Sequence, residues 1–377
     1  MDLDNFEPVA RIIVIGVGGA GNNAVNRMVD ENIENVEFYV LNTDKQALAT
    51  SKAPHRIVIG EEVTKGLGAG GDPEVGRQAA EASREAIAEI VKGANMVFIA
   101  AGMGGGTGTG ASPIVASIAK EAVAVTVAIV TRPFTFEGKA RIAHSVTGLN
   151  DLKAAVDSII IVSNDKLLAA NGNSPMSQAF AESDKVLAQS VKTVTDLILL
   201  PAMINLDFAD VRSTLKGSGI ALIGFGMGQG PNKAQDAAEN AISSPLLEAS
   251  ISGARRAICS ITAGENVSLY EAQECVNRII DQAGGTIDVK FGMSLNPHLD
   301  DTLLVSVIAS DFPSEYDFTA TPVFSGLQNR PGPTADFRTG ILGGEKAEEE
   351  VPEEKQDDIM DDILPNFLSG SILPSDE

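Results

Sequence analysis

The sequence predicts an α/β protein in which a mostly parallel sheet, with helices on both faces, is joined by a long central helix to a smaller α/β domain and a disordered acidic tail. Three observations predict this architecture. Short β-branched runs alternate with longer amphipathic stretches through the first half of the 377 residues. One long stretch of helical period then divides the chain. Beyond about residue 311, Pro, Gly, Ser and Glu replace most of the apolar residues.

The first half contains six runs with the length and composition of strands. They read as continuous apolar segments, which is typical of a parallel sheet covered on both faces. The expected strands are Arg11–Ile15, Glu37–Leu41, Arg56–Ile59, Asn95–Ala100, Ala122–Val130 and Ser158–Val162. Helical patterns separate them, for example over Pro73–Lys92, where the proline suits a first turn, and over Ser112–Glu121.

One long helix is expected over Ser177–Leu200, where apolar residues recur at helical spacing until Pro201 ends the pattern. A second α/β unit follows. Its expected strands are Ile220–Phe225, Ala257–Thr262, Thr286–Lys290 and Leu303–Ile308, with helices over Asn232–Ile242 and Leu269–Ala283. The expected divisions are an N-terminal domain over 1–176, the central helix over 177–201, a C-terminal domain over 202–312, a disordered linker over 313–356 and a tail over 357–377.

The composition excludes several classes of protein. The formal net charge of −23 argues against nucleic acid and anionic membranes as direct partners, so any membrane association is expected to be indirect. Cys259 and Cys275 are too few for a disulfide framework or a four-ligand zinc site, and a reducing, cytoplasmic setting is expected. The start of the chain lacks the pattern of a secretory signal, and the longest apolar stretch is shorter than the ~20 residues of a membrane-spanning helix.

A glycine-rich loop follows the first expected strand. Its residues, Gly16-Val-Gly18-Gly19-Ala20-Gly21-Asn22, satisfy the pattern G-x-G-x-x-G, and Asp44 follows about 20 residues later. Glycines let the backbone approach phosphates, and the helix start offers free N–H groups and the positive end of its dipole. This loop alone indicates a dinucleotide site, with a tight turn that needs glycine for steric reasons as the alternative.

Two further glycine-rich loops change that interpretation. Gly102–Gly110 offers a concave nest of backbone donors with two threonine hydroxyls, which suits a polyphosphate, and Gly66–Pro73 also precedes a helix. Loops that follow parallel strands meet at one edge of the sheet, where ligands bind. Three of them predict more phosphate than one pyrophosphate. The chain has neither a G-x-x-x-x-G-K-[ST] motif nor the motifs of protein kinases.

Six motifs, in their order along the chain, resemble those of the tubulin/FtsZ family, and most closely its bacterial cell-division members. They are GVGGAGNN, NTDKQAL, GLGAGGDPEVGR, GGGTGTG, TRPFTFEGKAR and NLDFADVR. The resemblance runs from about Phe6 to Ile308. It implies a tubulin-like, Rossmann-type GTPase domain and a polymerising cytoskeletal GTPase that forms the division ring at midcell in the cytoplasm.

The resemblance also implies a GTP/GDP site with Mg²⁺ bound alongside the nucleotide, and K⁺ as a candidate further ion, without a metal site made of side chains. The phosphates would be held by backbone N–H groups and threonine hydroxyls. The residues concerned are Gly18, Gly19, Ala20, Gly21, Asn22, Gly104, Gly105, Gly106, Thr107, Gly108 and Thr109. Ala69, Gly70 and Gly71 would sense the γ-phosphate.

The ribose and base would meet four side chains. By the resemblance, Glu137 and Arg141 bond the ribose, Phe180 stacks on guanine, and Asp184 accepts from its two adjacent donors. From the residues alone, Glu137 and Arg141 form a helix-surface ion pair and Phe180 is a core residue. Lys185 departs from the family pattern. Its side chain could lie beside the base or point into solvent, and the sequence favours solvent.

Asp207 and Asp210 lie three residues apart at an expected helix start, where carboxylates commonly cap the helix and meet its dipole. The resemblance implies a further role, in which they polarise the attacking water at the nucleotide of the next subunit and Asn205 orients them. Such sharing implies head-to-tail contacts between copies of the chain. Contacts of this kind propagate as filaments when they do not close into rings.

The segment DDILPNFL resembles the C-terminal peptide by which the family binds division adaptors and regulators. Its apolar residues would become ordered in a partner's groove. The residues concerned are Asp361, Ile363, Pro365, Phe367 and Leu368. The extra Leu364 and an acidic chain end depart from the usual pattern. A frayed end without a partner is the alternative.

Two other functions are weighed against this one. A NAD(P)-dependent oxidoreductase would use the first loop and Asp44, but it leaves two loops unexplained, and none of the three histidines stands in a proton-transfer motif. A noncatalytic tubulin-like scaffold would need neither the complete loops nor both carboxylates. A panel of nucleotides separates the first from a GTPase, and GTP-dependent light scattering separates the second.

Overall fold

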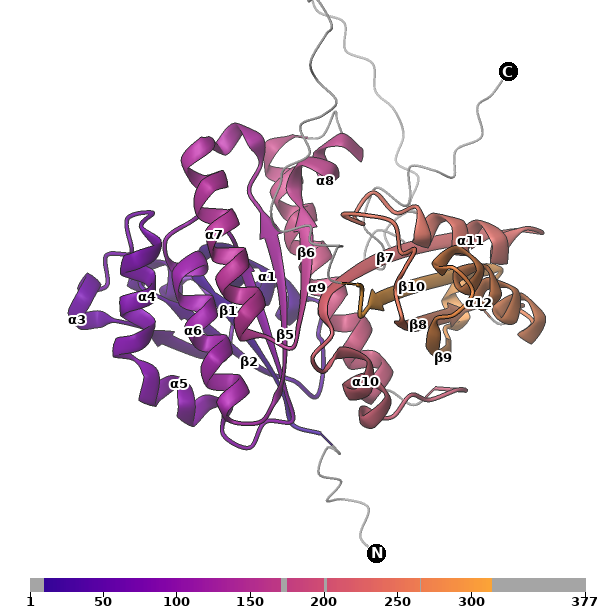
Figure 1. The fold of residues 1–377 in the computed structure, drawn as a ribbon, viewed down its shortest axis with the longest axis horizontal. Helices are drawn as coiled ribbons and strands as arrows, with labels where there is room; N and C mark the ends of the chain where they lie inside the picture. Colours follow the sequence, from indigo (N-terminus) through magenta and orange to yellow (C-terminus); the bar gives the residue numbers. More distant parts are fainter. Residues whose placement is uncertain (1–9, 171–174, 200–201, 265, 314–377) are drawn as a thin grey trace, which may run out of the picture.

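A computed structural model describes residues 10–170, 175–199, 202–264 and 266–313 (Figure 1). Within them ten strands form one sheet in the order β3-β2-β1-β4-β5-β6-β7-β10-β8-β9. The strands are β1 Ile12–Val17, β2 Glu37–Asn42, β3 His55–Val58, β4 Met96–Gly102, β5 Val125–Arg132, β6 Ser158–Ser163, β7 Gly219–Gln229, β8 Arg256–Ala263, β9 Asp288–Leu295 and β10 Thr302–Ser310.

The helices alternate with these strands, as the sequence predicts. They are α1 Gly18–Asp30, α2 Lys45–Ala49, α3 Glu61–Thr64, α4 Pro73–Ala82, α5 Arg84–Val91, α6 Thr107–Glu121, α7 Lys139–Ala155, α8 Asn164–Ala170, α9 Met176–Leu199, α10 Phe208–Leu215, α11 Lys233–Ile242 and α12 Leu269–Ala283. Two short 3₁₀ turns, η1 Thr135–Glu137 and η2 Pro297–Leu299, complete the set. None of the described helices has the length and apolar character needed to cross a membrane.

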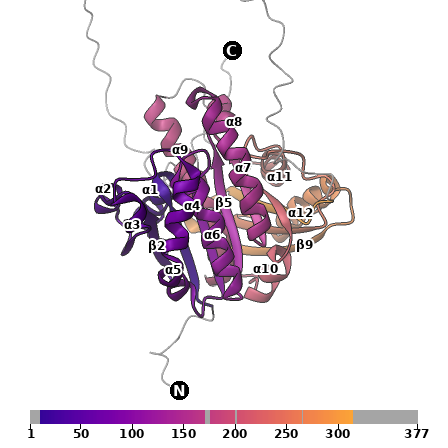
Figure 2. The same ribbon diagram turned by 60° about the vertical axis from the view of Figure 1, so that its left-hand side comes forward.

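The N-terminal part of the sheet is parallel and buried on both faces, which confirms the predicted α/β class. Along β1, Ile12 and Val14 pack into a core with α1 and α9, while Ile13 and Ile15 pack into a second core with α4 to α7. Figure 2 shows α4, α6 and α7 in front of the strands. The strand order reverses between β1 and β4, so the loops that follow these two strands open into one crevice.

The strand β7 connects the two parts of the sheet. Its first residues pair in parallel with β6, beginning at Gly219 opposite Ser158, and the rest, from Leu222 to Gln229, pairs antiparallel with β10. The helices α11 and α12 cover one face of the C-terminal strands, whose core includes the buried, unpaired thiols Cys259 and Cys275. The 24-residue helix α9 packs between this region and the parallel strands (Figure 1).

Three predicted boundaries were wrong for identifiable reasons. The helix expected over Pro73–Lys92 breaks into α4 and α5 at Ser83, whose hydroxyl accepts from Gly60 N at 2.9 Å. The helix expected from Ser112 begins at Thr107, because the end of the glycine loop forms its first turn. The strand expected from Ala122 begins at Val125, since Val123 has a φ of 66° and cannot continue a strand.

Candidate nucleotide-binding and catalytic sites

The three glycine-rich loops contact one another at the carboxyl edge of the parallel strands. A Cβ added to Gly18 would lie 2.8 Å from Gly108 N, so the first and second loops touch through their backbones. A Cβ added to Gly106 would lie 2.8 Å from Ala69 Cβ, so the third loop packs on the second. The three loops therefore pack together as one unit, and their backbones come so close that Gly18 and Gly106 have no room for a side chain.

Other glycines of these loops face open space. A Cβ added to Gly19, Gly70, Gly71 or Gly105 would meet no atom within 4 Å. Gly70 and Gly71 also have φ values of +62° and +82°, which side chains rarely adopt. A backbone without side chains around an open space is the surface that a polyphosphate requires.

The helices α1 and α6 both begin in this cradle, and neither has a side-chain cap. Their N-cap residues are Val17 and Gly106, and no acidic residue lies in either first turn. Their first backbone N–H groups therefore have no side-chain acceptor, and two positive helix ends face the same space. A bound anion would satisfy both.

Two polar side chains shape the loops from within. The Asn22 amide, oriented to suit its neighbours, donates to Gly16 O and Gly18 O at 3.1 and 2.9 Å. Thr109 Oγ1 accepts from Gly104 N at 2.8 Å. Both side chains are 3% exposed, so they hold the backbone of the cradle in shape.

Phe180 and Asp184 lie on the first turns of α9. Phe180 is 41% exposed, so the core position expected from the residues alone was wrong. Its ring meets the buried ring of Phe134 in a T-shaped contact at a centroid distance of 5.0 Å, and the rest of the ring is accessible to a ligand. Burial raises the pKa of Asp184 to about 7, and the nearby positive charge of Arg27 offsets part of that rise.

Glu137 and Arg141 form the i, i+4 ion pair that their spacing predicts. Glu137 also accepts from Phe134 N at 2.9 Å and is largely buried. The backbone of Arg141 lies against the second loop, because a Cβ at Gly104 would come within 2.9 Å of Arg141 O. The pair therefore stands between the phosphate cradle and the Phe134–Phe180 ring contact.

The sequence favoured a place in solvent for Lys185, and this was wrong. It is 6% exposed. With Gln189, Lys192 and Asp196 it follows helical spacing along one face of α9, so all four lie on the same side of the helix. The sequence could not predict the burial of Lys185 from its place next to Asp184, because consecutive residues of a helix point in different directions.

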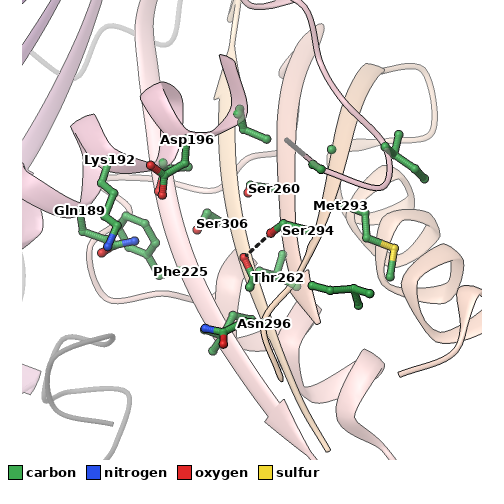
Figure 3. A pocket seen from close by; sticks show the side chains of 18 of the residues that line it. Gln189, Lys192, Asp196, Phe225, Ser260, Thr262, Met293, Ser294, Asn296 and Ser306 are labelled. Atoms are coloured by element: carbon green, nitrogen blue, oxygen red, sulfur yellow. Dashed lines mark hydrogen bonds between the residues drawn. The ribbon is translucent and has the colours of Figure 1, made fainter. Parts of the chain in front are cut away.

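That face of α9 borders a cavity of about 340 Å³ against β7, β8, β9 and β10 (Figure 3). Asp196 lies on its helical wall, and burial raises the pKa of Asp196 to about 6, with Lys192 offsetting part of the effect. On the opposite wall Thr262 and Ser294 share a hydrogen bond of 3.2 Å. None of the predicted site residues lines this cavity.

The two aspartates lie at the start of α10. Asp207 is the N-cap and accepts from Asp210 N at 2.8 Å, so the capping that the residues alone predict is present. Asp210 lies in the first turn, with Oδ1 4.0 Å from the ammonium of Lys290 on β9. Asn205 accepts from Ala202 N at 2.7 Å and so shapes the segment that leads to Asp207.

The structure does not bring the aspartates to the phosphate cradle of their own chain. Phe180 and Asp184 lie at the start of α9, Asp207 follows its end, and a 24-residue helix spans ~36 Å. The helix α10 also leads into the first residues of β7, which pair with the first residues of β6. The aspartates therefore lie toward the amino edge of the parallel strands, opposite the glycine loops, and Figure 1 shows α10 at the lower edge of the molecule.

Sequence reasoning missed three residues of these sites. Thr43 shares a 2.7 Å hydrogen bond with Thr107, Phe134 supports Phe180, and Lys290 meets Asp210. Phe134 lies inside the TRPFTFEGKAR motif, so its buried aromatic character was a usable signal. Lys290 stands 80 positions from its partner in an edge strand, and no local pattern marks it.

The fold and the site are those of a nucleotide-binding α/β protein with a candidate phosphate cradle built from three glycine loops. Comparison with known families gives two matches. The Tubulin/FtsZ family GTPase domain matches residues 11–172, and the FtsZ family C-terminal domain matches residues 219–313.

Solved structures agree with these matches. The FtsZ dimer of M. jannaschii is 40% identical, with a TM-score of 0.76 over 80% of this chain and 88% of that one. CetZ2 of Haloferax volcanii, a GTPγS-bound protofilament, and CetZ1, a GDP-bound monomer, are each 21% identical and share the fold. Their TM-scores are 0.67 and 0.70, over 79% and 81% of this chain and 92% and 95% of theirs. The chain belongs to the tubulin/FtsZ family, and it is a GTPase.

The family match replaces the oxidoreductase alternative with a GTPase. Asp44, which that alternative would use, is the N-cap of α2 and accepts from Gln46 N and Ala47 N. The expected partner-binding residues Asp361, Ile363, Pro365, Phe367 and Leu368 lie outside the described residues. Among the residues that the structure describes, no three His, Cys, Asp or Glu side chains are grouped so that they could hold a metal ion.

Proposed function

We propose that this chain polymerises head to tail into the filaments of the bacterial division ring, and that GTP is hydrolysed where two subunits meet. The glycine loops of one subunit hold the nucleotide, and Asp207 and Asp210 of the next subunit complete the site. The FtsZ protein of M. jannaschii, 40% identical, is a dimer in its solved structure. Contacts between unlike ends of identical subunits propagate as filaments.

One observation carries this proposal: the phosphate cradle and the aspartates lie at opposite ends of the same chain. A subunit that binds GTP at one end has its own Asp207 and Asp210 at the other end, where they do not reach that nucleotide. Stacking a second copy end to end supplies these carboxylates. Separation also avoids the permanent repulsion of two carboxylates and a triphosphate within one folded chain.

The cradle fits the triphosphate of GTP. The uncapped starts of α1 and α6 and the open backbone at Gly19 and Gly105 provide donors without side chains in the way. Mg²⁺ supplies charge neutralisation of the phosphates, and K⁺ is a candidate further ion. No described cluster of side chains would hold either ion by itself, so the phosphates would provide ligands.

The remaining predicted contacts follow from the same arrangement. Phe180 stacks on guanine, Asp184 selects it through two acceptor oxygens, and Glu137 with Arg141 orients the ribose. Ala69 to Gly71 close on the γ-phosphate from the third loop. In the next subunit, Asn205 shapes the segment that positions both aspartates.

We also propose a location at midcell in the cytoplasm and attachment to the membrane through adaptor proteins. The support is the sequence between Asp361 and Leu368, where apolar residues return within an acidic tail. Such a segment fits a groove on a folded partner. Deleting residues 357–377 should abolish adaptor binding and leave GTP turnover in solution unchanged.

The first experiment measures assembly and turnover together. Sedimentation with GTP, GDP or ATP in Mg²⁺ buffer should pellet the protein selectively with GTP. Phosphate release should rise more steeply than in proportion to protein concentration, because only paired subunits hydrolyse. Turnover strictly proportional to concentration down to high dilution would show that one chain is sufficient.

The second experiment assigns the two halves of the site to two chains. Asp210→Ala keeps the cradle and loses a carboxylate, whereas Gly105→Asp keeps both carboxylates and puts a negative charge where the phosphates bind. Gly105 is a suitable position because its Cβ meets no atom within 4 Å, so the fold tolerates the change. Each variant alone should be nearly inactive, and mixing them should restore turnover. No recovery on mixing would contradict a shared site.

A further inference from the structure

Lys290 on β9 places a positive charge beside Asp210, one of the two proposed catalytic carboxylates. Its ammonium lies 4.0 Å from Asp210 Oδ1 and 3.8 Å from Asp288 Oδ2. The Lys290 and Asp210 side chains are 35% and 37% exposed, so both reach the surface that a neighbouring subunit would meet. The pair also joins two elements, α10 and β9, that are far apart in sequence.

The aspartates create an electrostatic problem for the proposed interface. Two carboxylates that approach the triphosphate of a neighbour repel it, and this repulsion strengthens as water leaves the contact. A cation that travels with the carboxylates reduces the repulsion without occupying the nucleotide site. Lys290 lies beside Asp210 and therefore has the position to do this.

Other cations near α10 are less well placed. Arg256 is engaged with Asp311 and with Ser213 O. Arg212 follows Asp210 by two positions, which puts it about 200° further around the helix, and Lys216 follows by six. Among ion pairs of the described residues, the one that reaches Asp210 comes from Lys290.

We propose that Lys290 is a positioning residue of the shared GTPase site: it holds the Asp210 carboxylate in place and compensates its charge as it meets the triphosphate of the next subunit. This inference rests on the proposed head-to-tail function. It adds a residue from the C-terminal sheet to the interface, and it assigns the triphosphate of a second copy as the anion that Lys290 faces.

The pair contributes little to the free subunit. An ion pair with this exposure is solvated on both sides and screened by salt, so its loss has a small effect on folding. In the filament the same charges are shielded from water and interact more strongly. The effect of Lys290 should therefore appear in assembly and turnover, with folding and nucleotide binding by the monomer unchanged.

Lys290→Gln tests this in the full-length protein, with Lys216→Gln as the matched control. Lys216 is an exposed cation at the C-cap of α10, so both variants lose one positive charge near that helix. The critical concentration for GTP-dependent sedimentation should rise about threefold or more for Lys290→Gln and remain near that of the wild type for Lys216→Gln. Lys290→Arg should restore assembly.

Two further measurements separate positioning from a general structural role. Choline chloride added at constant K⁺, from about 50 to 300 mM, should raise the critical concentration of the wild type and reduce its difference from Lys290→Gln, because salt screens the compensating charge. Turnover per sedimented subunit should also fall in Lys290→Gln. GTP binding by the monomer should be unchanged, since the nucleotide site lies at the other end.

An unchanged critical concentration in Lys290→Gln, or an equal shift in Lys216→Gln, would overturn the inference. Failure of Lys290→Arg to restore assembly would also count against it. These outcomes leave the proposed function intact when wild-type protein still sediments with GTP and the mixing of Asp210→Ala with Gly105→Asp restores turnover. Wild-type protein that ignores GTP in sedimentation would instead overturn the proposed function.

Discussion

The two ends of the molecule use the start of a helix in opposite ways. At the nucleotide end, α1 and α6 begin after Val17 and Gly106, which provide no side-chain cap. At the other end, α10 begins after Asp207, whose carboxylate accepts from Asp210 N. The helix starts at the nucleotide end therefore have no anionic side chain as a cap, whereas the start of α10 is capped by the carboxylate of Asp207. Each is the electrostatic complement of the other.

In the proposed arrangement, this difference lets the free subunit fold at α10 without a ligand while its GTPase site stays incomplete. The start of α10 is satisfied within the chain, so no ligand is needed to fold it. The starts of α1 and α6 have backbone N–H groups without a side-chain cap. A bound phosphate is a stronger hydrogen-bond acceptor for these groups than water. In the proposal, nucleotide binding therefore belongs to one end, and the acid chemistry belongs to the other.

The largest expected effect is a loss of GTP turnover when a carboxylate is removed from the start of α10. Asp210→Ala should lower GTP turnover per sedimented subunit by about 100-fold or more, because it removes a group proposed to polarise the attacking water. GTP binding and assembly should persist, since the cradle is untouched. The measurement is phosphate release from sedimented filaments. Unchanged turnover would remove Asp210 from the proposed mechanism.

The sequence predicted most of the architecture because its signals are local. Continuous apolar runs identified the parallel strands, and helical spacing ended by Pro201 identified α9 to within one residue at each end. The three glycine loops could also be identified in the sequence, because positions where two backbones approach closely require glycine. Their mutual contacts depend on strand order, which no single motif encodes.

The parts that were missed depend on long-range packing. The burial of Lys185 follows from which face of α9 meets the C-terminal sheet, and the Lys290–Asp210 pair joins positions 80 residues apart. The exposure of Phe180 follows from its place near the start of α9, beside the ring of Phe134. Apolar character alone predicted a core position there, which was wrong.

The second prediction separates two roles of glycine within the nucleotide end. Gly110→Ala should reduce the free energy of unfolding by about 2–3 kcal/mol, because a Cβ there would lie 1.8 Å from Pro73 O and would force α4 and α6 apart. Gly105→Ala should leave stability nearly unchanged, since its Cβ meets no atom within 4 Å. Denaturant unfolding measures both.

Nucleotide affinity provides the control for this pair of variants. Gly105→Ala should weaken GTP binding, because the added methyl enters the space proposed for the phosphates. Equal stability losses in the two variants would contradict the distinction between a glycine required by packing and one required by the ligand.

The third prediction concerns pH at the nucleotide end. The pKa of Asp184 is about 7 in the free subunit, and accepting two hydrogen bonds from guanine favours the charged form. Binding therefore lowers that pKa and releases a proton where the free carboxyl is protonated. Affinity should fall as pH decreases through 7, and GDP should bind about tenfold more weakly at pH 6 than at pH 8.

The nucleotide's own phosphates also titrate in this range, so a variant is needed as the reference. Asp184→Asn presents an amide donor to one of the guanine donors and has no carboxylate to ionise. It should bind GDP weakly and show only the pH dependence of the phosphates. An identical pH profile in the wild type and in Asp184→Asn would exclude Asp184 as the titrating group.

The smallest expected effect separates capping from catalysis at Asp207. Asp207→Ala removes the acceptor for Asp210 N and should cost about 1 kcal/mol of unfolding free energy, whereas Asp207→Asn keeps an acceptor there and should cost less. Turnover should fall in both variants, because both lose the negative charge. Full turnover in Asp207→Asn would leave Asp207 as a helix cap alone, and Asp210 would then be the single carboxylate that α10 brings to the neighbouring nucleotide.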